Sequence, residues 1–382
     1  MINKIFKFSG VLLVGASLLA GTAFAQEPLE IEGGTVLFQG LNGPQGVLLD
    51  ADGNVWVAES GLGGEEEIQW ANAETGQLET VPMGNTARVV MISPEGELTE
   101  VAVLPSILAG TDTIGVSRLA LLDGELYATN GQWLEANGAD RLDLMGAVIH
   151  VDAEGAVTEA ASTWAVEDAS NPDGLIKDSH PYGITVGPDG WLWVADAGAN
   201  SLVRFNPETG EGEAVAAFAG VPAPFPNPTR GDAMETDPVP TAVAFDEDGN
   251  AYVSLLPGFP FLPGSAKVVL VTPEGEVSDY ATGLTMLTDL RVGPDGELYG
   301  VQFGVFGEQG PVPNSGAIVR IQEGAASELV VGGLPFATSI DFNADGDAYV
   351  TVNGVGAPGS GAVVVFPGLT DMEGQPLPAM EG

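Results

Sequence analysis

The feature that most constrains this chain is a short motif that recurs six times along its 382 residues. Each copy has an apolar run, an Asp-Gly turn and a second apolar run carrying Trp or Tyr. The turns are Asp52-Gly53, Asp123-Gly124, Asp189-Gly190, Asp248-Gly249, Asp295-Gly296 and Asp345-Gly346. Because glycine accepts positive φ without a Cβ clash, each copy predicts a β-hairpin.

A second hairpin is expected after each of the first five. The second turns lie at 94–96, 153–155, 207–210, 273–275 and 323–324. Two consecutive hairpins make a four-stranded antiparallel unit, and six units in tandem are typical of a β-propeller. The sequence therefore predicts an all-β fold, a six-bladed β-propeller in one domain.

The last unit is one strand short, and the missing strand is available at the other end of the chain. Residues 361–366 supply its third strand, and residues 34–38 precede the first repeat. Pairing the two would place an N-terminal and a C-terminal strand in one blade and leave no exposed sheet edge. The expected propeller spans 26–366, and 367–382, which is rich in proline, is expected to be a flexible tail.

Antiparallel strand order separates the loops into two groups. The tight turns lie at one end of every blade, so the long connections gather on the opposite face, here called the long-loop face. These connections are 60–88, 104–117, 130–146, 163–182, 218–241, 255–266 and 302–316. Long loops on a rigid scaffold commonly carry binding residues.

The N-terminus has the three parts of a secretory signal peptide. Lys4 and Lys7 precede an apolar stretch at 11–20, and Ala23-Phe24-Ala25 precedes Gln26. Cleavage after Ala25 would leave a secreted or periplasmic protein, and an uncleaved membrane anchor is the alternative. No later stretch has the ~20 apolar residues that a membrane span requires. The chain has no cysteine, which excludes disulfides, thiolate metal sites and cysteine nucleophiles.

The charge balance excludes nucleic acid as a partner. The formal charge is −42, and removal of the leader with its two lysines makes it 9 − 53 = −44. Phosphate backbones are bound by clustered Lys and Arg, which this chain lacks. Strong negative charge disfavours self-association, so we expect a monomer. The high negative charge would suit saline or acidic surroundings. A generally acidic composition of the organism's proteins explains the charge equally well.

Several segments carry a resemblance to known repeats. Residues 180–201, which begin His180-Pro181-Tyr182-Gly183, resemble an NHL repeat, and 43–61 resemble a second copy. Residues 255–268, with Gly258-Phe259-Pro260-Phe261, together with 280–284 and 288–290, resemble the ScyD/ScyE family. That family is similar in fold to six-bladed NHL and lactonase-type propellers. It is named after gene clusters for the pigment scytonemin, and the name defines no biochemical role.

Oxygen-bearing residues end four of the six second strands on the long-loop face. They are Glu59, Asn130, Asp196 and Gln302. Lactonase-type propellers hold a divalent cation with comparable residues, and such a set would suit calcium. The alternative is that Asp196 stabilises its own turn. Runs such as 50–54, 246–250 and 343–347 resemble calcium loops, but their glycine is fourth and no bidentate Glu follows, so hairpin turns are expected there.

Four residues near the axis are candidate ligand-binding residues. Arg118 and Asp289 replace the small residues found just before the inner strands of other blades, and blades two and five face each other across a six-fold ring. The two could orient an anionic or polar ligand, or pair through water and plug the channel. His180, beside Asp178 and Tyr182, precedes an inner strand and could act as a base or ligand, or be structural.

No complete catalytic set or phosphate-binding motif is present in the sequence. The long loops carry the aromatic residues Trp70, Trp133, Trp164, Phe225, Phe259 and Phe261. The leading hypothesis is therefore a binding or accessory protein that takes a small molecule or protein on its long-loop face, without an assigned catalytic residue. The alternatives are a calcium-dependent lactonase-like hydrolase of the gluconolactonase type, and an envelope protein that recruits partners through Trp70 and the Phe259 loop.

Overall fold

The computed structural model describes residues 28–377 except Glu74, Glu247 and Ala325. The predicted signal peptide lies outside the described residues. Within them strands are the dominant regular structure. Its helices are α1 (Thr163–Ser170) and the short 3-10 helices η1 (Glu135–Asn137), η2 (Pro228–Arg230) and η3 (Leu369–Asp371). None of these helices is long and apolar enough to cross a membrane.

Six sheets of four or more strands form the body of the described chain, and we number them in chain order. Sheet 1 contains β2 (Pro44–Leu49), β3 (Val55–Glu59), β4 (Glu66–Ala71), β5 (Leu78–Ile92), β6 (Leu98–Ala109) and β7 (Asp112–Ile114). Sheet 2 contains β8 (Val116–Leu122), β9 (Glu125–Asn130), β11 (Ala147–Val151) and β12 (Val157–Ser162). Sheet 3 contains β14 (Pro181–Val186), β15 (Leu192–Asp196), β16 (Ser201–Phe205) and β17 (Gly212–Ala217).

The second half of the chain continues the pattern. Sheet 4 contains β20 (Pro240–Phe245), β21 (Ala251–Leu255), β22 (Ala266–Val271) and β23 (Val277–Leu284). Sheet 5 contains β24 (Leu287–Val292), β25 (Leu298–Gln302), β28 (Gly316–Ile321), β29 (Glu328–Leu334) and β33 (Gln375–Pro376). Sheet 6 contains β30 (Ser339–Phe342), β31 (Ala348–Val352), β32 (Gly361–Phe366) and β1 (Thr35–Leu41). Three two-stranded pairs lie on the connections: β10 (Trp133–Leu134) with β13 (Asp178–Ser179), β18 (Val221–Asn227) with β19 (Ala233–Thr236), and β26 (Phe306–Gly307) with β27 (Gly310–Pro311).

The Asp-Gly segments form the tight turns that the repeat predicts. In sheet 1 the Gly53 N–H donates to the Asp50 carbonyl, and Gly53 has φ of 84°. The Asp50 carboxylate accepts from the N–H groups of Asp52 and Asn54 and from Trp56 Nε1. The acidic side chain of this calcium-like run therefore stabilises its own hairpin.

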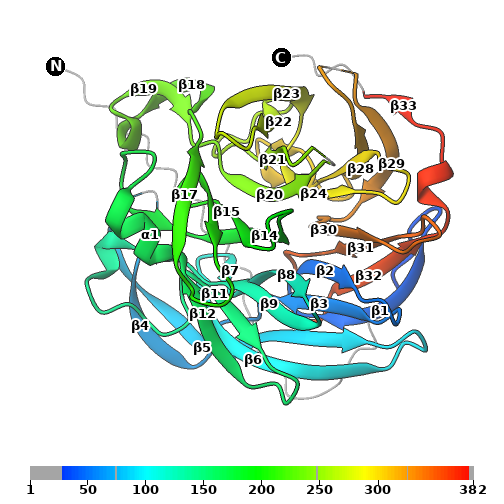
Figure 1. Ribbon diagram of the computed structural model, residues 1–382, viewed down its shortest axis with the longest axis horizontal. Coiled ribbons are helices and arrows are strands. Elements are labelled where there is room, and N and C mark those ends of the chain that lie inside the picture. The colour runs from blue at the N-terminus through cyan, green and yellow to red at the C-terminus, as the bar shows by residue number, and fades with distance from the viewer. Residues whose placement is uncertain (1–27, 74, 247, 325, 378–382) are drawn as a thin grey trace.

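The sheets stand side by side around a common centre, as Figure 1 shows. The first strand of each sheet contacts that of the next, in the order β2, β8, β14, β20, β24 and β30, and β30 contacts β2. At the junction of the two chain ends, β1 pairs with β32, with Thr35 opposite Val365 and Val36 opposite Val364. The terminal strands thus pair as the sequence indicates.

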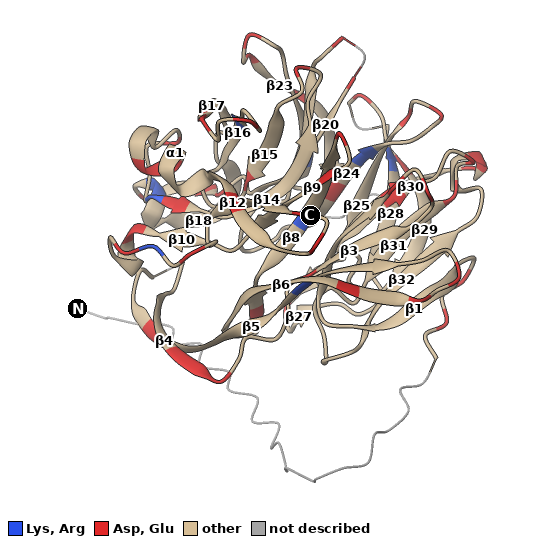
Figure 2. Cartoon of the chain, turned by 60° about the horizontal axis from the view of Figure 1, so that its bottom comes forward, with Lys and Arg blue, Asp and Glu red and all other residues tan. Residues whose placement is uncertain are grey.

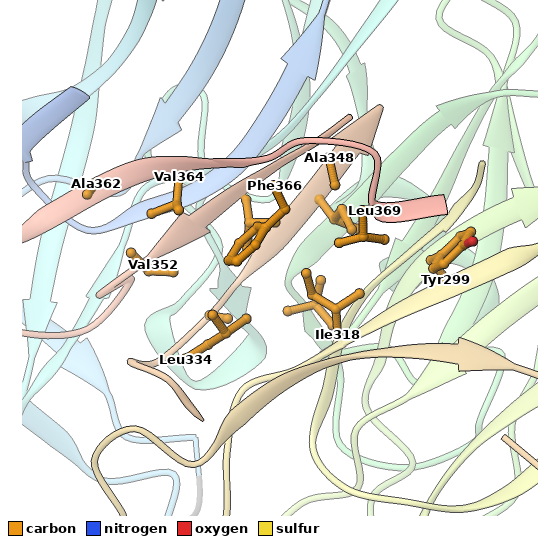
Figure 3. Packing of buried hydrophobic residues seen from close by; sticks show 13 residues of the cluster. Tyr299, Ile318, Leu334, Ala348, Val352, Ala362, Val364, Phe366 and Leu369 are labelled. Carbon is orange, nitrogen blue, oxygen red and sulfur yellow. The ribbon is translucent and has the colours of Figure 1, made fainter. Parts of the chain in front are cut away.

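The hydrophobic core lies between neighbouring sheets. Figure 3 shows the cluster between sheets 5 and 6, where Phe366 and Val364 of β32 face Ile318 and Leu334. Burying such side chains stabilises the fold by ~1.5–3 kcal/mol each. The cluster includes Leu369, which lies beyond the predicted end of the propeller and is fully buried.

The C-terminal segment differs from the expected tail over its described part. The strand β33 pairs with β29, with Leu329 opposite Gln375. Arg320 donates to the carbonyls of Thr370 and Met372. As far as Leu377, the segment therefore packs against sheet 5 because an apolar side chain and two carbonyls find partners there.

The long connections carry more structure than the sequence indicates. In sheet 1 the predicted loops 60–88 and 104–117 largely form strands: β5 and β6 have 15 and 12 residues, and β4 and β7 pair along them. The loop 163–182 contains α1, whose N-cap Ser162 accepts from the Ala165 N–H. The secondary-structure propensity of these residues did not indicate β4, β7 or α1, because each of them is stabilised by packing against another segment of the chain.

Candidate functional site

The inner strands carry bulged residues at their long-loop ends. The pairing register shifts between Pro44 and Gly46, Pro181 and Gly183, Pro240 and Ala242, and Leu287 and Asp289. The residues skipped by the pairing are Gln45, Tyr182, Thr241 and Thr288. A bulge re-aims its side chain, and here Thr241 and Thr288 reach a neighbouring sheet while also contacting their own, at Ser254 and Val301.

Threonine hydroxyls at this level link neighbouring sheets. Thr241 donates to the Leu287 carbonyl at 2.8 Å and Thr338 to the Pro44 carbonyl at 2.7 Å. Thr288 lies 3.3 Å from the Ala337 carbonyl. These bonds close part of the ring around the centre and leave the hydroxyl groups engaged.

Arg118 occupies the centre of the ring. Its guanidinium donates to the carbonyls of Thr288 and Thr338 at 2.6 and 2.7 Å and to the carbonyl of Gln45. Its Cζ lies 4.5 Å above the ring of Tyr182, a cation–π geometry. One buried side chain of sheet 2 therefore contacts sheets 1, 3, 5 and 6.

Asp289 joins this central cluster from sheet 5. Its Oδ1 lies 3.7 Å from Arg118 Nε, and both side chains are nearly fully buried. Its Oδ2 accepts from the Ser339 hydroxyl at 2.5 Å and from the Ile340 N–H at 3.0 Å. The structure brings the two predicted residues together. Arg118 Nε is the one buried polar atom of the pair that makes no hydrogen bond to a described residue.

Tyr182 and His180 lie beside the central cluster. The Tyr182 hydroxyl donates to Gln45 Oε1 at 2.9 Å, and Gln45 Nε2 donates to the Gly354 carbonyl. The His180 ring meets Tyr182 edge-on at 6.3 Å between centroids. Burial lowers the pKa of His180 to about 4, so the ring is neutral at pH 7.

Three of the four predicted metal ligands are held by their own sheets. Glu59 accepts from the Asn42 N–H at 2.5 Å, Asp196 from the His180 N–H at 2.7 Å, and Gln302 from the Thr285 N–H at 2.7 Å. Each donor belongs to the segment that leads into the first strand of the same sheet. The three acceptors therefore fix the start of the inner strand, and Asp196 also accepts from the Ala199 N–H of its own turn at 3.2 Å.

Additional contacts reinforce this role for the two acids. Glu59 is fully buried and forms an ion pair with Arg88 at 2.6 Å. Asp196 also accepts from the Ser179 hydroxyl at 2.7 Å, and burial raises its pKa to about 6. In the part of the chain that the structure describes, no three His, Asp or Glu side chains gather into a group that could hold a metal.

Asn130, the fourth predicted ligand, differs from the other three. Its Nδ2 donates to the Leu144 carbonyl at 2.8 Å. Its Oδ1 is buried and accepts no hydrogen bond from a described residue. It is the one member of the predicted set with a free buried oxygen.

Buried carboxyl groups gather beneath α1, and the sequence did not indicate them. Both oxygens of Glu167 are buried without a hydrogen-bond partner in the described chain. Burial, followed by the charges of Asp196 and Asp173, raises its pKa to about 8. Asp178 accepts from Gln132, and burial raises its pKa to about 8. These acids come from a helix and two strands, so no sequence spacing could reveal the cluster.

The loop aromatics divide into a buried pair and an exposed row. Trp70 and Trp133 meet edge-on at 5.7 Å and are almost fully buried. The exposed row, which we call the phenylalanine ledge, consists of Phe225 and Phe259, which are exposed, and of Phe261 and Phe306, which are half-buried. Consecutive ring centroids are 5.8, 6.1 and 5.0 Å apart. Phe306 was not among the predicted residues.

The ledge joins three long connections. Phe225 lies on β18, Phe259 and Phe261 on the loop after β21, and Phe306 on β26. Phe225 and Phe259 are 40% and 53% exposed, which is unusual for linked aromatic rings. A cavity of about 220 Å³ lies nearby at the end of sheet 5, lined by residues that include Thr285 and Gln302. It is smaller than the ~300–1,000 Å³ of typical ligand pockets.

The described surface has almost no free positive charge. All nine Lys and Arg residues after the leader lie within 4.0 Å of an acidic oxygen. They are Arg88, Arg118, Arg141, Lys177, Arg204, Arg230, Lys267, Arg291 and Arg320. Figure 2 shows the acidic residues spread over many loops and the basic residues confined to a few places.

Comparisons with known proteins identify the fold class. No protein-family profile matches the sequence, and no curated protein matches it significantly. A structural-genomics protein of unknown function from Bacteroides thetaiotaomicron matches with a TM-score of 0.51 at 13% identity, over 87% of this chain and 71% of that chain. A protein from Thermus thermophilus assigned as a glucose dehydrogenase matches with a TM-score of 0.51 at 18% identity, over 87% of this chain and 98% of that chain.

Virginiamycin B lyase from Staphylococcus aureus matches more weakly, with a TM-score of 0.45 at 14% identity, over 85% of this chain and 94% of that chain. The two matches with a TM-score of 0.51 define the fold and not the activity, because unrelated activities share the same folds. The chain is an all-β protein of the β-propeller type.

Proposed function

We propose that this chain is an exported six-bladed β-propeller that acts as a binding protein through its long-loop face. The six sheets are its blades, and β1 completes the last of them. We also propose that the chain is related to the ScyD/ScyE family, which its sequence resembles. The observation that carries the binding function is the phenylalanine ledge, because its four linked rings come from three separate loops and two of them, Phe225 and Phe259, expose apolar surface that a ligand would cover.

The central cluster supplies the rigid support for that face. Arg118 and Asp289 seal the centre, and Glu59, Asp196 and Gln302 hold the starts of three inner strands. The long loops therefore begin and end at strands whose positions are fixed by these contacts. Preformed binding surfaces of this kind lose little conformational freedom when a ligand binds.

A calcium-dependent lactonase-like hydrolase is the second candidate. The observation that favours it is the buried and unpartnered Oδ1 of Asn130. The hydrogen bonds of Glu59, Asp196 and Gln302 weigh against it, since their oxygens already accept from backbone N–H groups. Metal analysis of protein purified without chelator, with lactone turnover assayed before and after Asn130→Ala, separates the two candidates.

The binding function is tested with Nile red, a neutral dye that fluoresces on apolar surfaces. We expect native protein to enhance its fluorescence, and the double substitution Phe225→Ser with Phe259→Ser to remove most of the effect. Val277→Ser is the matched control, because Val277 is 44% exposed on β23, away from the ledge. Equal fluorescence from the ledge variant and the wild-type protein contradicts the proposal.

A further inference from the structure

We propose that the phenylalanine ledge binds an extended peptide segment of another protein that carries both apolar and positively charged side chains. The inference rests on the proposed binding function and adds the chemical class of the partner. It is carried by the ring spacing of the ledge, by the acidic residues around it and by the pairing of all described cations.

The ring spacing suits an extended chain. Side chains on the same face of a β-strand repeat at about 6.6 Å. Phe225 and Phe259 lie 5.8 Å apart and Phe259 and Phe261 6.1 Å apart, close to that repeat, and Phe306 follows at a shorter 5.0 Å. Alternate apolar side chains of a peptide can therefore meet successive rings. The backbone under the ledge is fixed, since the Thr236 hydroxyl donates to the Phe259 carbonyl at 2.9 Å.

Acidic residues stand at both ends of the ledge. Asp232 is exposed and Glu235 half-buried on the β18–β19 hairpin that carries Phe225. Glu308 is exposed in the turn between β26 and β27, two residues after Phe306. The cation of the first hairpin, Arg230, lies 3.2 Å from Asp237, so it is already paired.

Charge complementarity then selects the partner. An approaching peptide meets acidic groups on this face, while every described Lys and Arg is engaged by an acid of the chain itself. Lys and Arg side chains of the partner can pair with Asp232, Glu235 and Glu308, and they can lie over exposed Phe rings. A second copy of this acidic chain is repelled, because its formal charge has the same sign.

The test measures binding of three synthetic peptides by fluorescence anisotropy at physiological salt. One alternates Lys and Leu, one alternates Glu and Leu, and one alternates Lys and Ser. We expect the Lys-Leu peptide to bind tightest, and Phe225→Ser with Phe259→Ser to weaken it about tenfold. The Val277→Ser control should leave its affinity unchanged, and thermal unfolding of each variant verifies folding.

The remaining outcomes separate the two proposals. If the Glu-Leu peptide binds as tightly as Lys-Leu and loses affinity in the ledge variant, the ledge binds apolar segments and the charge inference is wrong. If Lys-Leu and Lys-Ser bind equally and neither depends on the ledge, attraction is purely electrostatic and the inference fails. Retention of Nile red binding in that case leaves the proposed function standing.

Discussion

At the residue scale, Arg118 is the side chain on which the centre of the molecule depends. Its guanidinium bonds to carbonyls of three other sheets and lies beside Asp289. Removing it leaves three carbonyls without this donor and the buried Asp289 carboxylate without its counter-charge, although Ser339 and Ile340 still donate to that carboxylate. Breaking a buried pair on one side costs far more than breaking an exposed one.

We therefore expect Arg118→Met to lower the free energy of unfolding by about 3–5 kcal/mol. Urea unfolding measures the change. Lys267→Met is the matched control, because its pair with Asp279 is partly exposed, and it should cost less than about 1 kcal/mol. Similar losses in the two variants would show that the central cluster contributes no special stability.

The pairing of Arg118 with Asp289 could be predicted, but their other partners could not. Aligning the six repeats places both residues at one level of opposite blades, and the structure has them 3.7 Å apart. The carbonyl acceptors depend on bulges next to Gln45 and Thr288. A bulge changes the direction of a backbone group without a distinctive residue in the sequence, so these contacts were not predictable.

At the element scale, α1 carries the buried Glu167 and packs against β13, which carries Asp178. The pKa of Glu167 rises from an ordinary 4.5 to about 8, by burial first, and that of Asp178 rises from 3.8 to about 8. The folded state therefore holds protons that the unfolded chain releases. The stabilising contribution is complete below about pH 4 and is lost as the pH rises through about 8.

We expect the amides of α1 to lose protection between about pH 6 and pH 9 beyond the intrinsic pH dependence of exchange. Glu167→Gln should remove much of this loss and raise the free energy of opening at pH 9 by about 1–3 kcal/mol. Hydrogen exchange measures it. Glu154→Gln, at an exposed turn, is the control and should change nothing. A pH-independent opening of α1 in wild-type protein would refute the assignment.

The elements of the blades were predictable, whereas those of the loops were not. The Asp-Gly turns combine a residue that accepts positive φ with strands of regular pattern, and all six hairpins form at them. The β4–β5 pairing and the β18–β19 hairpin have no such signal, because apolar and polar residues do not alternate regularly in the segments around Gln69 and Pro222. The phenylalanine ledge could not be predicted from the sequence, because its residues come from three separate loops that meet only in the folded protein.

At the scale of the whole molecule, sheet 6 is completed by one strand, β1, that lies far from its partner β32 in sequence. Deleting residues 26–41 removes β1 and leaves β32 as an open edge. We expect a loss of several kcal/mol, roughly the burial energy of two or three core side chains, and self-association through the exposed edge. Thermal unfolding and size-exclusion chromatography measure both effects.

A synthetic peptide of residues 28–42 supplies the control for this deletion. Added in trans, it should restore much of the lost stability and suppress association, because it can pair with β32 in the native register. A peptide of the same composition in scrambled order should do neither. A deletion variant that stays monomeric and unfolds at the wild-type temperature would show that closure by β1 is dispensable.

The final property of the whole molecule is its charge, formally −42. Unpaired carboxylates repel one another, and salt shortens the range of that repulsion from ~10 Å at 0.1 M to ~3 Å at 1 M. We expect Tm to rise steadily with NaCl and to rise equally with KCl, since screening does not depend on the ion. Calcium chloride at matched ionic strength then discriminates between screening and a specific site: a rise already complete at micromolar calcium, and absent in Asn130→Ala, would favour the lactonase-like alternative over the binding function.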